Sequence, residues 1–221
     1  MRKAFAVLVL AAFCACPSFS QSILTASEFF KSVSDFYGSI QDYEADTQIT
    51  VGNGGAMRGK VSFKRPEMLR IDFSQPDGQT IRFTGETLVI YLPGSSAILQ
   101  QTVKGSGAAA ATPEGLSLMR RYYTVAYESG QTPVPLEEGS EEMVVNLILR
   151  RRSGSEAFSK MLLSVDPSTR LIRRIVATTP ADLDYIFYFS NYSLNTGMGE
   201  QRFIYDPPSS ANNYNNFLFS E

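Results

Sequence analysis

The chain has 221 residues, with 20 Lys and Arg against 22 Asp and Glu, which gives a formal net charge of −2. A chain with 43% hydrophobic and 19% charged residues is too apolar and too weakly charged to be disordered, and its length fits one domain of moderate size. The near-zero net charge excludes a strongly basic nucleic-acid binder that depends on counterion release. We therefore expect a globular protein with no nucleic-acid partner.

The N-terminus has the pattern of a secretory signal peptide. A basic start at Met1–Lys3 precedes an apolar run at residues 4–16, and small residues follow that suit cleavage after Ser20. A membrane-spanning helix needs roughly 20 apolar residues, so this run is too short to be an anchor. The sequence predicts a cleavable signal peptide at 1–20 and one domain at 21–221.

Two helices are predicted from cap signals and helical spacing. Thr25 and Glu28 form a capping box in front of apolar residues at helical spacing, which predicts a helix over residues 26–40. Thr112 as a cap, followed by a proline and an early acidic residue, starts a second helix that runs to about Tyr122.

The rest of the chain alternates apolar and polar residues and predicts a long antiparallel meander. The expected strands cover residues 43–51, 57–65, 69–74, 81–84, 88–92, 97–103, 142–150, 158–165, 170–178, 183–194 and 201–205. The end of the chain, 206–221, is expected to be loose, with Phe217 and Phe219 as docking points.

These elements predict an α+β fold that is mainly β. Alternating strands form a sheet with one dry face, and a sheet of about ten strands curls. Helices of about 15 and 10 residues are only about 22 and 15 Å long, which is short beside such a sheet. Two alternatives remain open at this point: an incomplete barrel with a helical lid over an apolar hollow, or a solid core.

The residue types restrict the chemistry. The chain has no His, and both cysteines, Cys14 and Cys16, lie within the predicted signal peptide. The exported domain would hold 18 basic and 22 acidic residues, a net charge of −4, with no disulfide. This excludes a Ser-His-Asp triad, a Cys-His pair and a Cys/His zinc site. An alternative to free export is a lipid-modified Cys16, which would tether the chain to a membrane.

A carboxylate-dependent hydrolase or an oxygen-ligand metal site is still allowed by composition. The densest acidic run, EEGSEE at 137–142, is typical of a solvated loop. We therefore expect no enzyme, no metal and no cofactor.

Two glycine-rich segments resemble nucleotide-binding loops without their context. Gly54–Lys60 has phosphate-loop spacing, but Val61 stands where a Ser or Thr should reach the metal, and a strand pattern follows. Residues 105–110 match the loose dinucleotide pattern, but no βαβ unit surrounds them and Pro113 falls inside the helix that would follow. The sequence predicts a hairpin turn and a small-residue loop.

Three motifs carry a family resemblance. The segments Gly59–Arg70 (GKVSFKRPEMLR), Gln75–Gly78 (QPDG) and Gly85–Pro93 (GETLVIYLP) resemble the LolA family of periplasmic lipoprotein carriers, and weaker matches follow at 172–175 and 203–208. The resemblance implies a strongly curved antiparallel sheet, an incomplete barrel, with a helical lid that encloses an apolar cavity.

The resemblance also implies a function. Such a protein would bind the acyl chains of lipoproteins and ferry them across the periplasm from the inner to the outer membrane. Its partners would be acylated lipoproteins, the inner-membrane ABC transporter that releases them, and an outer-membrane acceptor, with the carrier as a monomer. The same fold serves lipid- or lipoprotein-sensing regulators, so a sensor, free or tethered, is the alternative.

The resemblance assigns Arg65, in the Lys-Arg-Pro motif, as a latch that holds the lid shut. A guanidinium carries a fixed fork of donors that can reach several carbonyls, although a solvated charge at a strand end is the simpler alternative. The candidate cavity residues are the apolar side chains of the first helix, the early strands and the lid, for which plain core packing is the alternative: Phe29, Val33, Phe36, Leu69, Ile71, Phe73, Ile81, Phe83, Leu88, Ile90, Leu116 and Met119.

Overall fold

The computed structural model describes residues 24–102, 111–154 and 156–217. The predicted signal peptide, the loop at 105–110 and Phe219 lie outside these ranges. The described elements, in chain order, are α1 (Ala26–Ser39), β1 (Asp42–Val51), β2 (Met57–Lys64), β3 (Met68–Gln75), β4 (Asp77–Thr84), β5 (Thr87–Leu92), the 3-10 turn η1 (Pro93–Ser95), β6 (Ala97–Thr102), α2 (Pro113–Tyr122), β7 (Tyr123–Tyr127), β8 (Val134–Pro135), β9 (Met143–Arg151), β10 (Lys160–Val165), β11 (Ile172–Thr178), β12 (Asp184–Leu194), the 3-10 turn η2 (Glu200–Phe203) and β13 (Asn212–Asn215).

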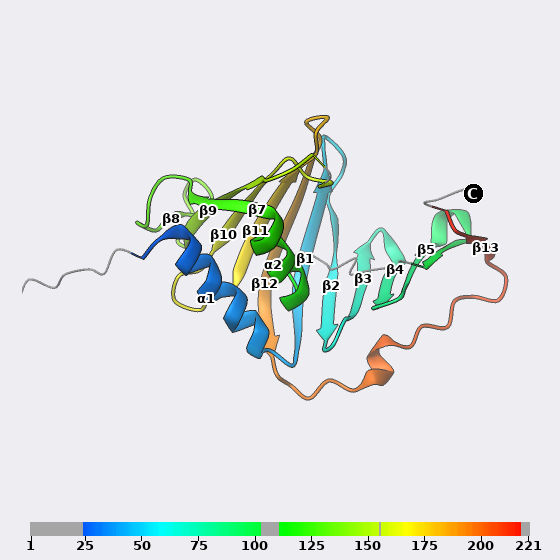
Figure 1. Cartoon of the computed structure of the whole chain (residues 1–221). Helices are drawn as coiled ribbons and strands as arrows, with labels where there is room; N and C mark the ends of the chain where they lie inside the picture. The colour runs from blue at the N-terminus through cyan, green and yellow to red at the C-terminus, as the bar shows by residue number, and fades with distance from the viewer. Residues whose placement is uncertain (1–23, 103–110, 155, 218–221) are drawn as a thin grey trace, which may run out of the picture.

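One large open sheet dominates the molecule (Figure 1). Its strand order is β13-β6-β5-β4-β3-β2-β1-β12-β11-β10-β9-β7, and β8 pairs with β9 beside this path. Neighbouring strands are antiparallel except for β13 and β6, which are parallel. The predicted mainly β fold, a curved antiparallel sheet with two helices on it, is confirmed.

Both helices begin where their caps predict. The Thr25 hydroxyl accepts a hydrogen bond from the Glu28 amide at 3.2 Å, and the Glu28 carboxylate accepts from the Thr25 amide at 2.9 Å. The Thr112 hydroxyl accepts from the Gly115 amide at 3.1 Å, with Pro113 at the first helical position. These bonds satisfy amides that no helical carbonyl can reach, so each cap sets the start of its helix.

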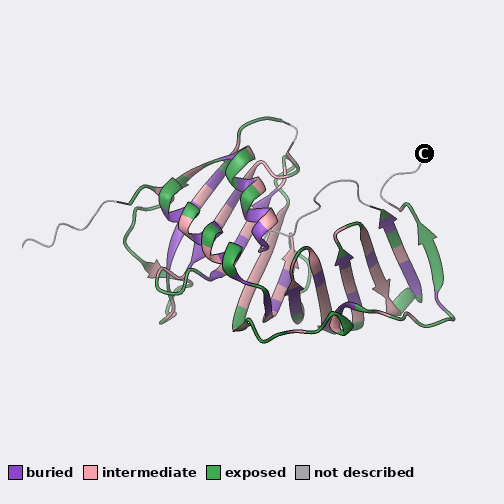
Figure 2. Cartoon of the chain, turned by 60° about the horizontal axis from the view of Figure 1, so that its bottom comes forward, coloured by how far each residue is buried: buried purple, intermediate pink, exposed green. Residues whose placement is uncertain are grey.

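The helices cover only one part of one face of the sheet. Figure 2 shows α1 and α2 over the part that ends at β7, with β3–β6 beside them and no helix in front. We call this side the inner face. The main hydrophobic cluster joins both helices to the inner-face side chains of β1, β2 and β9–β11, and its most buried aliphatic members are Val33, Leu116, Leu147, Leu149, Leu163, Ile172 and Ile175.

The outer face of β3–β5 is crossed by the segment 196–211, which we call the C-terminal strap. Arg70 on β3 donates to the carbonyls of Arg202 and Ile204, at 3.1 and 2.9 Å, and Phe203 is 3% exposed. Beyond the strap, β13 pairs with β6 and covers what would otherwise be the sheet edge. An uncovered edge strand is a site for unwanted pairing, so this end of the chain protects the sheet.

Asp42 fixes the beginning of the strap. Its buried carboxylate accepts hydrogen bonds from the amides of Thr196, Gly197 and Met198, at 2.8, 3.1 and 3.2 Å, and from the Thr196 hydroxyl at 3.0 Å. Burial by itself raises the pKa of Asp42, but these hydrogen bonds outweigh it and hold that pKa below its ordinary value.

Two predictions about this end of the chain are wrong. Residues 201–205 form no strand; Glu200–Phe203 is a 3-10 turn, because side chains of β3 and β4 take the carbonyl groups that a ladder would have used. The tail is not loose throughout, since Asn212–Asn215 pairs with β6. The sequence analysis also missed β7 and β8, short strands beside β9.

Candidate functional site

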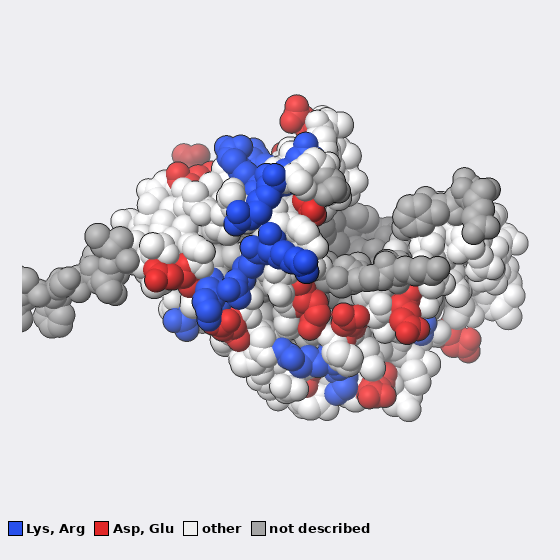
Figure 3. Space-filling model, in the orientation of Figure 1, with Lys and Arg blue, Asp and Glu red and all other residues white. Residues whose placement is uncertain are grey.

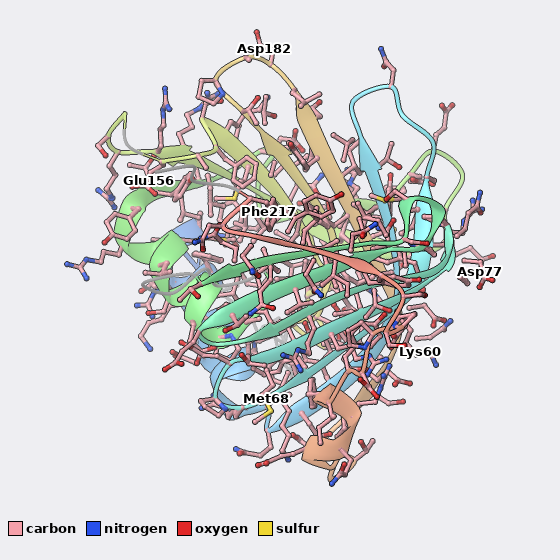
Figure 4. All side chains as sticks on the ribbon, turned by 90° about the vertical axis from the view of Figure 1, so that its right-hand side faces the viewer. Lys60, Met68, Asp77, Glu156, Asp182 and Phe217 are labelled. Atoms are coloured by element: carbon pink, nitrogen blue, oxygen red, sulfur yellow. The ribbon has the colours of Figure 1, made fainter. Side chains whose placement is uncertain are left out.

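The inner face of β3–β6 carries cross-strand rows of apolar side chains. In the register of these strands Leu69 faces Phe83, and Phe83 faces Leu88. In the next row Ile71 faces Ile81, Ile81 faces Ile90, and Ile90 faces Leu99. Figure 4 looks onto the sheet from this end, with the start of β3 at Met68 and the turn at Asp77 at opposite ends of the strands. Directly opposed side chains lie close enough to form a continuous surface.

These rows lead out of the core onto a surface that the helices do not cover. Leu69 and Phe83 are buried and belong to the main cluster, while Ile71 and Leu88 are half-buried at its margin. Further along, the half-buried residues belong to neither hydrophobic cluster of the described part of the chain. We define the open apolar face as Ile71, Ile81, Leu88, Ile90 and Leu99.

The twelve predicted cavity residues fall into two groups. Phe36, Ile71, Ile81, Leu88 and Ile90 are half-buried, and the last four lie on the open apolar face. The others are buried: Phe29, Val33, Leu69, Phe73, Phe83, Leu116 and Met119. The structure thus brings the sheet candidates onto one face and places most of the helix candidates in the packed layer beneath the helices.

Arg65 lies directly after β2 and reaches the end of α1. Its Nε donates to the carbonyl of Ile40 at 2.8 Å, its Nη2 donates to the carbonyl of Gly38, and its backbone amide donates to Gln41 at 2.9 Å. The last turn of α1 contains no basic residue of its own. The guanidinium therefore meets the unpaired carbonyls and the negative dipole end of this helix. Its hydrogen bonds to described residues go to this end of α1 and not to α2.

The start of α2 is held by a residue that the sequence analysis did not single out. The buried Tyr43, on β1, donates its phenol to the carbonyl of Ala111 at 2.9 Å, one residue before the α2 cap. A tyrosine in an alternating strand gives no signal of such a contact, because its partner is 68 residues away.

Tyr43 belongs to a buried tyrosine cluster. Tyr37 on α1 accepts from the Ile172 amide at 3.1 Å, and Tyr192 on β12 donates to the Ile172 carbonyl at 2.9 Å. Burial raises the pKa of Tyr37 to about 12 and raises the pKa values of Tyr43 and Tyr192 well above the ordinary value. All three are therefore neutral near pH 7 and act as hydrogen-bonding groups between helices and sheet.

Two pockets lie away from the open apolar face. One, of about 630 Å³, is on the outer face, where Asp46, Arg58 and Tyr188 meet the loop before β9. The other, of about 400 Å³, lies between α1, α2 and β7. Within residues 24–102, 111–154 and 156–217, no group of three acidic, His or Cys side chains could hold a metal ion.

A family model described as outer membrane lipoprotein carrier protein LolA matches residues 45–206, more than half of the chain. The chain belongs to the LolA family. The resemblance in the three sequence motifs is thereby confirmed, and all three lie within the matched range.

Solved structures show how widely the LolA-family fold is shared. An uncharacterised conserved protein from Thermus thermophilus is similar with a TM-score of 0.56 and 16% identity, over 86% of this chain and 99% of that one. MucB is similar with a TM-score of 0.53 and 12% identity, over 82% of this chain and 62% of that one. In the Pseudomonas aeruginosa MucA/MucB complex the values are 0.50, 13%, 82% and 61%. At such identities the likeness concerns the fold alone.

No curated protein matches the sequence significantly. Among the helices in the described ranges, none is long and apolar enough to cross a membrane.

Proposed function

We propose that this LolA-family chain is a periplasmic carrier that binds the acyl chains of lipoproteins and ferries them from the inner to the outer membrane. The observation that supports this proposal is the open apolar face, where rows of Ile and Leu side chains continue from the core onto a surface with no helix over it. Apolar side chains without polar partners suit a ligand that has no fixed shape and no hydrogen-bonding groups.

The strength of acyl binding sets what the carrier must do. Each methylene that leaves water contributes about 0.8 kcal/mol, so two or three full-length chains represent tens of kcal/mol. A half-open face shields only part of each chain. In this proposal the helices move to complete the cover, and the contacts that restrain them are the Arg65 bonds to α1 and the Tyr43 bond ahead of α2.

The partners follow from the energetics. Gly54–Lys60 passes through a turn into strand β2 and lacks the helix of a phosphate loop, so this motif gives the chain no nucleotide site. In this proposal loading draws its energy from an inner-membrane ABC transporter, and release runs downhill to an outer-membrane acceptor. The carrier acts as a monomer.

The test isolates the exported protein and identifies what is bound to it. We expect acylated lipoproteins in its mass spectrum, and we expect Ile81→Asp and Ile90→Asp to lose most of them, because each places a charge in the apolar row. Thr84→Asp is the matched control, since Thr84 is exposed and lies on the outer face of β4. Lipoprotein binding that survives both isoleucine changes would contradict the proposed site.

N-terminal analysis of the same preparation separates a free carrier from a tethered sensor. A mature chain that starts at Gln21 supports the carrier. A lipid-modified Cys16 supports the tethered alternative.

A further inference from the structure

The pocket of about 400 Å³ between α1, α2 and β7 is lined by three arginines from two parts of the chain. Arg120 and Arg121 come from the last turn of α2, and Arg152 follows the end of β9. Ser27 and Ser117 add hydroxyl groups. Figure 3 shows Lys and Arg side chains gathered on the face of the molecule that carries the helices. We call the three arginines the arginine pocket.

The arginine pocket has no counter-charge of its own. None of the residues that line it is acidic, and the three arginines form no ion pair with any residue in the described ranges. The domain as a whole is acidic, with 18 basic and 22 acidic residues after residue 20. Basic residues at the end of α2 do complement its helix dipole, but Arg152 is not on that helix, so the dipole does not account for it.

Arg152 is held in place by the backbone beside it. Its Nε donates to the Tyr123 carbonyl at 3.1 Å, and its backbone amide donates to the Tyr122 carbonyl at 2.8 Å. The Arg121 guanidinium lies over the Tyr122 ring at 5.4 Å. Two of the three guanidinium groups are therefore positioned by the structure, with further donors left for a ligand.

The chemistry of the lining indicates the ligand. Guanidinium and hydroxyl groups supply several donors for phosphate oxygens, while Phe30 and Val125 give the same pocket an apolar wall. We propose that the arginine pocket binds the phosphate groups of anionic phospholipids and docks this face of the protein on an anionic membrane surface.

The choice of a lipid surface rests on the proposed function, because a carrier of acyl chains must reach membranes to load and unload. The helices that form the pocket lie on the same face of the sheet as the open apolar face. Docking through the arginines therefore turns the acyl-binding side toward the lipid.

The test measures binding of the full mature chain to phosphatidylcholine vesicles with and without phosphatidylglycerol. We expect binding only when phosphatidylglycerol is present, and we expect it to weaken as salt is added. A basic residue near an anionic surface is worth about fivefold in partitioning, so Arg120→Gln with Arg121→Gln should weaken binding by about 25-fold. Neither side chain makes a hydrogen bond to a described residue, so the fold should be kept.

The matched control removes two charges from the outer face of the sheet. Arg150 and Lys160 face each other on β9 and β10, on the side away from the buried Leu149. Arg150→Gln with Lys160→Gln changes the net charge equally and should leave vesicle binding unchanged. Arg120→Lys with Arg121→Lys should retain most of the binding, because the charge is kept.

Three results would overturn the inference: equal binding to both vesicle types, full binding by the Arg120→Gln and Arg121→Gln variant, or an equal loss in the control. Soluble polyglutamate is a separate arm. If it binds through the arginines while phosphatidylglycerol vesicles do not, the partner is an acidic protein and the lipid surface is wrong. The glutamine variant should still carry acylated lipoproteins; if the wild-type chain carries none but docks on the vesicles, only the proposed function fails.

Discussion

Tyr43→Phe tests whether the buried phenol controls the helix that covers the sheet. The change removes the bond from the Tyr43 hydroxyl to the Ala111 carbonyl, 2.9 Å away, and keeps the ring in the core. A hydrogen bond contributes about 1 kcal/mol, and a buried carbonyl left without a partner costs about 1–3 kcal/mol. Ala111 is 4% exposed, so water does not readily replace the phenol.

The loss should be greatest at α2, because Ala111 lies immediately before its cap. If the bond restrains opening of this helix, a cost of about 1.4 kcal/mol makes the Pro113–Tyr122 amides exchange about tenfold faster. The melting temperature should fall by about 2–4 °C for each kcal/mol lost from the whole domain. Hydrogen exchange read by mass spectrometry, together with thermal unfolding, measures both.

Tyr192→Phe is the control. It loses a buried phenol that donates to the Ile172 carbonyl at 2.9 Å, far from α2 in the chain. It should lower overall stability without speeding exchange in α2 selectively. If α2 exchanges no faster in Tyr43→Phe than in Tyr192→Phe, the tether argument is refuted.

Three further predictions concern the other restraints on the sheet. Arg65→Leu should still bind acyl chains but release them more slowly to acceptor vesicles, with Arg65→Lys between it and the wild type; normal release would remove the latch role from Arg65. Asp42→Asn should lower the free energy of unfolding at pH 7 by about 1–3 kcal/mol. Because the folded pKa of Asp42 is lowered, its stabilisation is complete above the ordinary carboxyl pKa and is lost as the pH falls through the folded value, so urea titrations of mutant and wild type should converge in acid, and a constant difference would contradict this. Phe203→Ala, at a side chain 3% exposed, should cost at most about 3–5 kcal/mol and raise proteolysis of the C-terminal strap; an unchanged cleavage pattern would show that Phe203 does not hold it.

Local signals predicted most of the secondary structure. Thr25 with Glu28 and Thr112 with Pro113 set both helix starts within the sequence itself, because each cap depends on residues at most three positions apart. Alternation of apolar and polar residues located the strands from β1 to β6 and from β9 to β12, since one face of each packs on a core.

The same signals failed where a segment's partners are distant. Residues 201–205 alternate like a strand, but Arg70 and Arg82, more than 100 positions earlier, take the carbonyls of the C-terminal strap. β7 is a short strand on one side of the sheet, and only pairing with β9 identifies it.

The candidate site was predicted in composition but not in arrangement. Periodicity indicated that Ile71, Ile81 and Ile90 share a dry face, and the family resemblance singled out Arg65. That Arg65 binds the end of α1, that Tyr43 reaches Ala111, and that Arg152 joins the end of α2 depends on folding, because each contact closes a long loop.

The sequence by itself determined the element types, the apolar face of each strand and the LolA-family motifs, because these depend on residues within a few positions of one another. Only the tertiary structure decided how much of that face the helices cover. Two short helices pack over one part of a large curved sheet, and chain connectivity places the strap on the outer face of the rest. The inner face of β4–β6 consequently remains open, although its residues have the same pattern as those in the core.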